Sequence, residues 1–150
     1  MIVCNPSEKQ IEESIKIAEE LKEWFTAEAI KNMRIDFEKN SLIVNTDKGK
    51  VDGFLCYTTY SGKTLLIWMG IARKAHRKGI GNSLLKWLEQ ETKKLNLYSI
   101  EVETLPDEIK YEPYNQTRNF YYKNGFERVF YKKARIKGWD DQIILEKKIV

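Results

Sequence analysis

The stretch LLIWMGIARKAHRKGIGNSLL, residues 65–85, determines how the chain is expected to fold. It opens on a nearly continuous apolar run, residues 65–72, which is typical of a strand buried on both faces of a covered sheet. From Ile80 to Leu95 the apolar side chains recur every three or four residues, which predicts a helix. Residues 98–105 then return to strand alternation, so the whole segment predicts a strand–helix–strand crossover.

Further elements are predicted on both sides of this crossover. They are helices at residues 8–25, 30–37 and 119–123, and strands at residues 41–46, 51–59, 126–136 and 141–149. The first helix opens on the Ser7–Gln10 capping box, and the last two strands form a C-terminal β-hairpin. The sequence therefore predicts one α/β domain over residues 1–150, with a mixed sheet and helices on both of its faces.

The composition narrows the class of protein. The 150 residues carry 26 Lys and Arg against 22 Asp and Glu, and 42% are hydrophobic, which predicts an ordered globular chain. No apolar run approaches the roughly 20 residues of a membrane span, and the N-terminus is too polar for a signal peptide. With only Cys4 and Cys56, a disulfide scaffold is excluded and a cytoplasmic location is expected. The single histidine, His76, excludes a histidine-cluster metal site.

The net charge of +4 is unevenly distributed along the chain. Residues 7–37 hold eight acidic and five basic side chains, whereas residues 71–94 hold seven basic and two acidic ones. A basic stretch of this kind can be an anion site, a nucleic-acid surface or a solvated helix face. The acidic region could guide a cationic substrate or could equally be a solvated face.

The turn between the buried strand and the helix favours an anion. Gly79 and Gly81 let backbone N–H groups approach a phosphate, and Arg77 and Lys78 add charge beside the helix N-terminus. The alternative is that these glycines only make a tight turn. Two known phosphate motifs are excluded. Leu84 stands at the third glycine position of a dinucleotide fingerprint, and Tyr57 stands at the first glycine position of a P-loop that would end at Gly62-Lys63-Thr64.

At this point the sequence resembles a known family. The segment RKGIG, followed by NQTRNFYYKNGFE at residues 115–127, resembles the cofactor motif and the later FYxxxGF segment of the GNAT superfamily of N-acetyltransferases. The resemblance covers residues 40–150 in the family's order. There are two departures: the Arg or Gln position of the motif falls on His76, and Asn115 lies one residue nearer to Tyr121 than in the commonest pattern.

The resemblance implies a GNAT-like fold and direct acetyl transfer from acetyl-CoA to a primary amine, without a metal or a covalent intermediate. It implies that Tyr121 protonates the leaving thiolate. Glu101 and Glu103 are alternate residues of one predicted strand and share a face, so either could accept the amine proton directly or through water; the alternative is that this pair faces solvent. The cofactor-binding residues that the resemblance implies are Met69, Ile71, His76, Arg77, Lys78, Gly79, Ile80, Gly81, Asn82 and Asn115.

Other readings remain open at the level of sequence. A non-catalytic module that binds acyl-CoA would carry the same motif, and a nucleic-acid-binding protein would use the basic stretch, although no alternating basic and aromatic surface is evident. Trp68, Tyr57 and Tyr60 either line an acceptor pocket or belong to the core. The expected partner is a small-molecule or peptide amine, not a nucleic acid or a membrane, and the terminal hairpin makes a homodimer possible through its edge strands.

Overall fold

The computed structural model describes residues 1–149. The chain divides into two compact units. The first unit comprises residues 1–58 and 66–91, and the second comprises residues 59–65 and the chain from Thr92 onward. The prediction of a single domain over residues 1–150 stays a prediction. None of the helices within residues 1–149 is long and apolar enough to cross a membrane.

The first unit holds most of the chain's N-terminal elements. These are β1 (Ile2–Val3), α1 (Glu8–Glu20), α2 (Ala27–Lys39), β2 (Ser41–Asp47), and the greater part of β3 (Lys50–Tyr60), β4 (Lys63–Ile71) and α3 (Ile80–Lys94). The strands neighbour one another in the order β1-β2-β3-β4, and β2 runs antiparallel to both β1 and β3. The two-residue strand β1 was not predicted, because it is too short to show a period.

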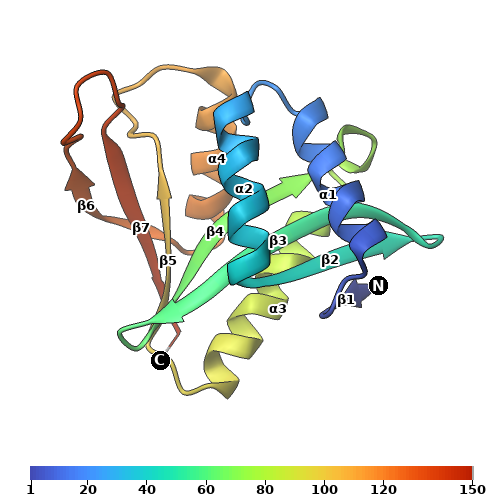
Figure 1. Ribbon diagram of the computed structural model, residues 1–150. Coiled ribbons are helices and arrows are strands. Elements are labelled where there is room, and N and C mark those ends of the chain that lie inside the picture. The colour runs from blue at the N-terminus through green and yellow to red at the C-terminus, as the bar shows by residue number, and fades with distance from the viewer. Residues whose placement is uncertain (150) are drawn as a thin grey trace. The chain divides into compact units, whose positions relative to one another are not determined.

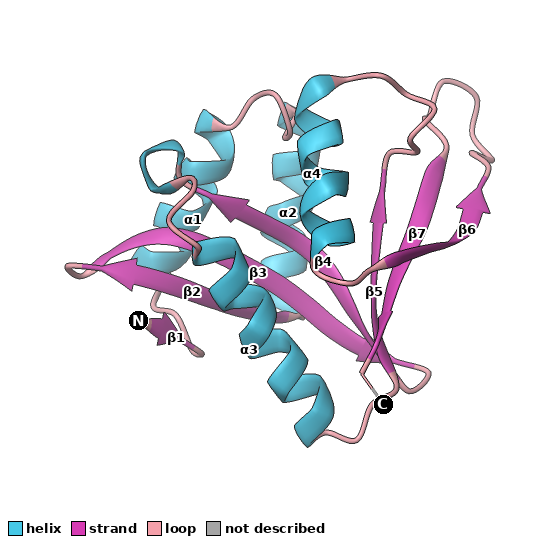
Figure 2. Ribbon diagram, turned by 180° about the vertical axis from the view of Figure 1, so that it is seen from behind, coloured by secondary structure: helices cyan, strands magenta, loops and turns pink. Residues whose placement is uncertain are grey.

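Successive side chains of β3 point to opposite faces of the sheet, and each face is covered by a helix. The Phe54 ring packs edge-on against Phe37 of α2, with ring centroids 5.6 Å apart. The Tyr57 ring instead packs against Trp87 of α3, with ring centroids 5.8 Å apart. The first unit therefore has three layers, with α2 and α3 on opposite faces of the sheet, as Figures 1 and 2 show from opposite sides.

The start of α1 agrees with the prediction, but its end does not. The Ser7 Oγ accepts from the Gln10 N–H at 3.2 Å, and the Gln10 side chain accepts from the Ser7 N–H at 2.9 Å, which completes the capping box. The helix ends at Glu20 rather than at residue 25, because the chain turns at Leu21, whose carbonyl accepts from the N–H groups of Trp24 and Phe25. Thr26 then caps α2.

Strand β4 is less buried than its apolar sequence predicts. Ile67, Trp68 and Met69 are half-buried, so the prediction of burial on both faces is wrong for this part of the strand. The Trp68 Nε1–H donates to Asp36 Oδ2 at 2.7 Å, and its ring packs edge-on against Phe25. The indole N–H of Trp68 needs a hydrogen-bond acceptor, so this face of the strand is not uniformly apolar.

The second unit holds β5 (Ser99–Thr104), α4 (Glu112–Lys123), β6 (Glu127–Lys132) and β7 (Gln142–Lys148). Its strands follow the order β4-β5-β7-β6, in which β4 and β5 are parallel and β7 is antiparallel to both of its neighbours. The predicted α/β class, mixed sheet, crossover β4–α3–β5 and C-terminal hairpin β6–β7 are confirmed.

Two boundaries in the second unit differ from the prediction. Helix α4 begins at Glu112 rather than at residue 119, because Pro113 stands in its first turn, where the missing N–H costs nothing. Strand β6 ends at Lys132 rather than at residue 136, and residues 133–141 form a loop.

The packing of Gly70 in the first unit gives a test of this core. A Cβ at Gly70 would lie 2.7 Å from the ring of Phe54, which is completely buried, so the ring would have to shift within the core. Replacing Gly70 by Ala should lower the free energy of unfolding by about 1–3 kcal/mol, measured by urea denaturation. Asn32→Ala on the exposed face of α2 should change it by less than about 0.5 kcal/mol. Equal effects of the two substitutions would contradict the packing described.

Candidate active site

The turn from β4 into α3 has the backbone shape of an anion-binding loop. Arg77 and Gly79 both have left-handed backbone, with φ of 66° and 78°. The Ser83 N–H donates to the Gly79 carbonyl at 3.0 Å, which begins the helical hydrogen bonding of α3. The N–H groups in the first turn of a helix carry a partial positive charge, and α3 has no acidic residue in this turn. This end of α3 therefore favours an anion.

The predicted pyrophosphate-binding residues are contiguous and mostly exposed at this turn. His76, Arg77, Lys78 and Gly79 are exposed, as is Asn82 one residue into the helix beyond Gly81. Ile80 differs, because it is 9% exposed and its side chain belongs to the core. Ile80 can therefore contribute only its backbone. The cofactor roles of all these residues, and of Met69 and Ile71 on β4, stay predictions.

His76 fixes the turn to the end of β4. Its Nε2–H donates to the Ile71 carbonyl at 2.7 Å, and its ring packs edge-on against Trp24 with centroids 6.3 Å apart. Next to it, Arg73 pairs with Glu23 and donates to the Glu20 carbonyl. The turn is thus held against the loop between α1 and α2, which is also in the first unit.

Tyr121 lies on α4 in the second unit and is only 4% exposed. Its ring packs edge-on against Phe120 and Phe126, with centroids 5.3 and 5.2 Å away. Burial raises the pKa of the Tyr121 hydroxyl well above its usual value, because the phenolate would be poorly solvated. Tyr121 is therefore protonated at neutral pH, as a proton donor must be.

The two candidate carboxylates of β5 lie in different environments. Glu101 is buried and accepts from Tyr60 Oη at 2.8 Å and from Lys63 Nζ at 2.6 Å. Glu103 is exposed and pairs with Lys132, at 3.0 Å. Because Glu101 is already held by two donors, Glu103 is the more accessible of the two for a proton.

Lys63, which in the sequence matches only the end of a rejected P-loop motif, belongs to a cluster of charged side chains in the structure. Its ammonium pairs with Glu101 at 2.6 Å and with Glu146 at 3.0 Å, and these two carboxylates raise the pKa of Lys63. In the sequence Lys63 looks like an ordinary turn lysine between Gly62 and Thr64. No local signal points to a partner 38 residues away.

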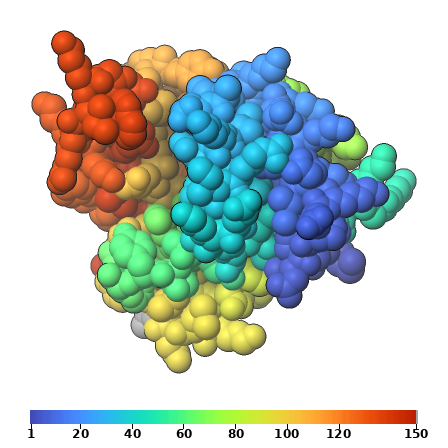
Figure 3. Space-filling model, viewed as in Figure 1, coloured from blue at the N-terminus to red at the C-terminus, as the bar shows by residue number. Residues whose placement is uncertain are grey.

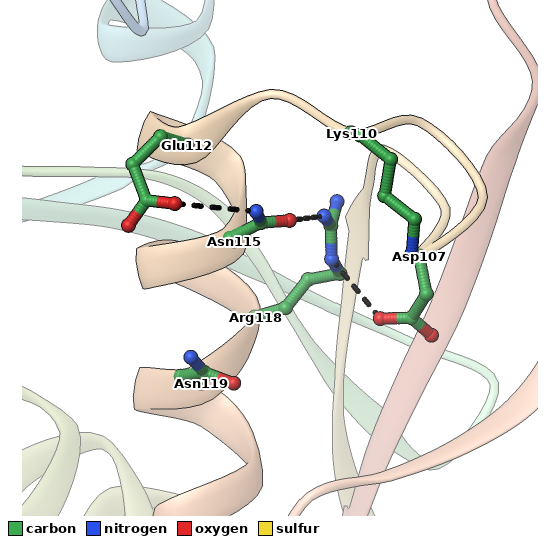
Figure 4. A pocket seen from close by; sticks show the side chains of 6 residues that line it. All are labelled: Asp107, Lys110, Glu112, Asn115, Arg118 and Asn119. Carbon is green, nitrogen blue, oxygen red and sulfur yellow. Dashed lines mark hydrogen bonds and ion pairs between the residues drawn. The ribbon is translucent and has the colours of Figure 1, made fainter.

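A polar pocket of about 320 Å³ opens at the start of α4, within the second unit (Figure 4). Its lining residues are Asp107, Lys110, Glu112, Asn115, Arg118 and Asn119. The Asn115 amide is engaged inside this group, because its Oδ1 accepts from Arg118 and its Nδ2 donates to Glu112 at 3.4 Å. The predicted cofactor role of Asn115 would therefore require this amide to exchange partners.

The remaining aromatic candidates separate into core and surface positions. Tyr57 packs against Trp87 on the α3 side, and burial raises the pKa of its hydroxyl. Tyr60 is exposed but donates to Glu101. Trp68 lies on the other face of the first unit's sheet, beside Phe25. Within residues 1–149, no three His, Cys, Asp or Glu side chains come together in a way that could hold a metal ion.

The chain matches a known protein family in sequence and solved structures in fold. A family model described as an acetyltransferase (GNAT) domain matches residues 38–128. No curated protein matches the chain. Among solved structures, a protein from Desulfovibrio desulfuricans assigned to the GNAT family aligns with a TM-score of 0.89 at 20% identity, over 100% of this chain and 99% of its own.

Two further structures share the fold. The ribosomal-protein-S18-alanine N-acetyltransferase of Escherichia coli aligns with a TM-score of 0.78 at 17% identity, over 99% of this chain and 93% of its own. A GNAT family acetyltransferase from Elizabethkingia anophelis, solved with acetyl-CoA bound, aligns with a TM-score of 0.74 at 16% identity, over 99% of this chain and 97% of its own.

The reactivity of the two cysteines tests the burial described for Cys56. Burial raises the pKa of the Cys56 thiol to about 12, whereas Cys4 is exposed. In the native protein at pH 8, a thiol reagent should therefore label one cysteine per chain, and in denaturant it should label both. A Cys4→Ser variant should show no rapid labelling in the native state. Rapid reaction of Cys56 would contradict its description as an inert core thiol.

Proposed function

Because the chain belongs to the acetyltransferase (GNAT) domain family, we propose that it transfers an acetyl group from acetyl-CoA directly to a primary amine. The observation that carries this proposal is the turn into α3. Left-handed backbone at Arg77 and Gly79, and a first helical turn without a carboxylate, suit the pyrophosphate of a coenzyme. Arg77 and Lys78 supply full positive charges at the same turn.

The residues of the first unit would bind and orient the coenzyme. We propose that the backbone of residues 79–82 receives the pyrophosphate, with Arg77 and Lys78 beside it. The half-buried residues Met69 and Ile71 on β4 would lie along the pantetheine arm. His76, tied to the Ile71 carbonyl, would hold the turn in shape while its outer edge faces the phosphates.

The residues of the second unit would move the protons. The amine nitrogen attacks the thioester carbonyl, the carbon–sulfur bond breaks, and the sulfur takes a proton from the Tyr121 hydroxyl. The amine loses its proton to the Glu103 carboxylate, directly or through one water. Burial keeps the Tyr121 hydroxyl protonated at neutral pH, so its proton is present when the thiolate forms.

Direct transfer agrees with the state of the cysteines. A covalent acetyl-cysteine intermediate needs an accessible thiolate, and Cys56 is buried with a raised pKa. Cys4 is exposed, but it lies in no nucleophile motif. The charges of the N-terminal helices bear on which amine accepts the acetyl group. Among the acidic residues of the N-terminal helices, Glu12 pairs with Arg34, and Glu23, just after α1, pairs with Arg73. These two carboxylates are thus already neutralised, which weakens the idea that they guide a cationic substrate.

Charge reversal at the two ends of α3 tests the coenzyme site. Lys78→Glu places a carboxylate beside the proposed pyrophosphate and should weaken coenzyme A binding about tenfold, measured by calorimetry. Lys93→Glu makes the same change at the exposed C-terminal end of the helix and should leave the affinity within about twofold. No binding of coenzyme A by the unaltered protein at millimolar concentration would overturn the proposal.

Thiol release from acetyl-CoA across a panel of amines tests the reaction. The right amine should accelerate release strongly, and Tyr121→Phe should lower kcat by about 10²-fold or more while coenzyme binding persists. Glu103→Gln should lower the rate with amines that are protonated at the assay pH. Tyr98→Phe, at an exposed position, serves as the control. Binding without turnover on every amine would instead favour a non-catalytic acyl-CoA-binding module.

A further inference from the structure

One buried cation in the second unit is not used by the proposed chemistry. Arg118 is 2% exposed, although it stands in the middle of α4. A guanidinium is always charged in proteins, and burying it is costly unless it is paired and its donors are satisfied. The groups that pair with the buried Arg118 charge therefore show which parts of the fold it holds in place.

The Arg118 guanidinium is directed into the loop that joins β5 to α4. It donates to the Leu105 carbonyl at 2.8 Å and to the Ile109 carbonyl at 3.2 Å, and its Nε lies 3.0 Å from Asp107 Oδ1. It also donates to Asn115 Oδ1, one turn earlier in the same helix (Figure 4). One side chain thus fixes the start, middle and end of a loop with no regular structure.

A second set of contacts holds the same loop from outside. The other oxygen of Asp107 accepts from Tyr122 Oη at 2.9 Å and from Arg128 at 3.2 Å. Arg128 also grips Glu108 through two nitrogens, at 3.0 and 3.1 Å. The two arginines share the Asp107 carboxylate, but Arg118 is buried, whereas Arg128 is exposed.

The clamped loop connects the two elements that carry the proposed acid and base. Glu103 lies two residues before Leu105, where the loop begins, and Tyr121 lies three residues after Arg118 on α4. Residues three apart on a helix share a face, and both Arg118 and Tyr121 are buried. The residue that holds the loop and the proposed acid thus stand on the same buried side of one helix.

We propose that Arg118 is a positioning residue that sets Tyr121 for proton donation by clamping the β5–α4 loop to α4. This inference rests on the proposed function. It requires the planar, forked guanidinium, because the loop carbonyls and the Asp107 carboxylate are reached by different nitrogens of one rigid group. A lysine would keep the charge but could not hold all of these acceptors at once.

A double-mutant cycle tests the inference. Arg118→Gln should lower kcat about 10- to 100-fold and leave the KM for acetyl-CoA within about twofold. Adding Arg118→Gln to Tyr121→Phe should cost less than about threefold more, because the hydroxyl that Arg118 positions is already gone. Arg128→Gln, the exposed partner of the same carboxylate, should change kcat by less than about threefold. Losses that multiply in the double variant would overturn the proposal, as would a rise in KM alone.

The variant Arg118→Lys tests the same proposal with a charge-preserving substitution that is less disruptive to folding. Lysine preserves the charge but not the fork, so kcat should still fall about tenfold. Circular dichroism and urea denaturation would show whether each variant remains folded. Full activity of a folded Arg118→Lys protein would contradict the need for the guanidinium.

A measurement without turnover separates this inference from the proposed function. Tyrosine ionisation, followed by ultraviolet absorbance against pH, should show one additional tyrosine titrating in the ordinary range near pH 10 in Arg118→Gln. That extra step should be missing from the Arg118→Gln/Tyr121→Phe double variant. If no amine is acetylated but this step appears, the proposed reaction is wrong while the clamp on Tyr121 stands. An unchanged titration would overturn the clamp whatever the activity.

Discussion

The left-handed backbone at Arg77 and Gly79 is the constraint on which the first unit's site depends. It lies in the segment 72–79, which joins the end of β4 at Ile71 to the start of α3 at Ile80 and includes a 3-10 turn at Arg73–Ala75. Left-handed backbone costs an arginine roughly 1 kcal/mol, and the surrounding contacts must offset that cost. The hydrogen bond from His76 to the Ile71 carbonyl and the pairing of Arg73 with Glu23 are the contacts that do so.

The second unit depends on a different kind of constraint, the pairing of two cations, the half-buried Lys63 and the buried Arg118, with nearby acceptors. Lys63 joins Glu101 and Glu146, and so ties the β3–β4 turn to β5 and β7. Arg118 joins the β5–α4 loop to α4. Removing one partner of such a group leaves an uncompensated charge in a poorly solvated place. The geometry of β5, which carries Glu103 between these two clusters, is thereby fixed from both of its ends.

The sequence predicted the elements whose signals are local. The capping box at Ser7 marked the start of α1, and the change of period after Ala72 marked the crossover. The end of α1 was missed because Trp24 and Phe25 continue the apolar spacing, although the chain already turns at Leu21. The first half of α4 was missed because Arg118 occupies a buried position, where a charged residue reads as solvent-exposed. Likewise, the ion pair between Lys63 and Glu101 has no local signal, because the two residues lie 38 positions apart in the sequence.

The bulge in β6 has a consequence for the open edge of the sheet. Strand β6 has one neighbour, β7, and all six of its residues are exposed, including Val129 and Phe130. Its register shifts between Arg128 and Phe130, so Val129 is an extra residue with no partner on β7. A foreign strand laid along β6 would lose its ladder of hydrogen bonds halfway. The bulge at Val129 therefore interrupts pairing along this exposed edge, which also carries the charged residues Glu127, Arg128 and Lys132.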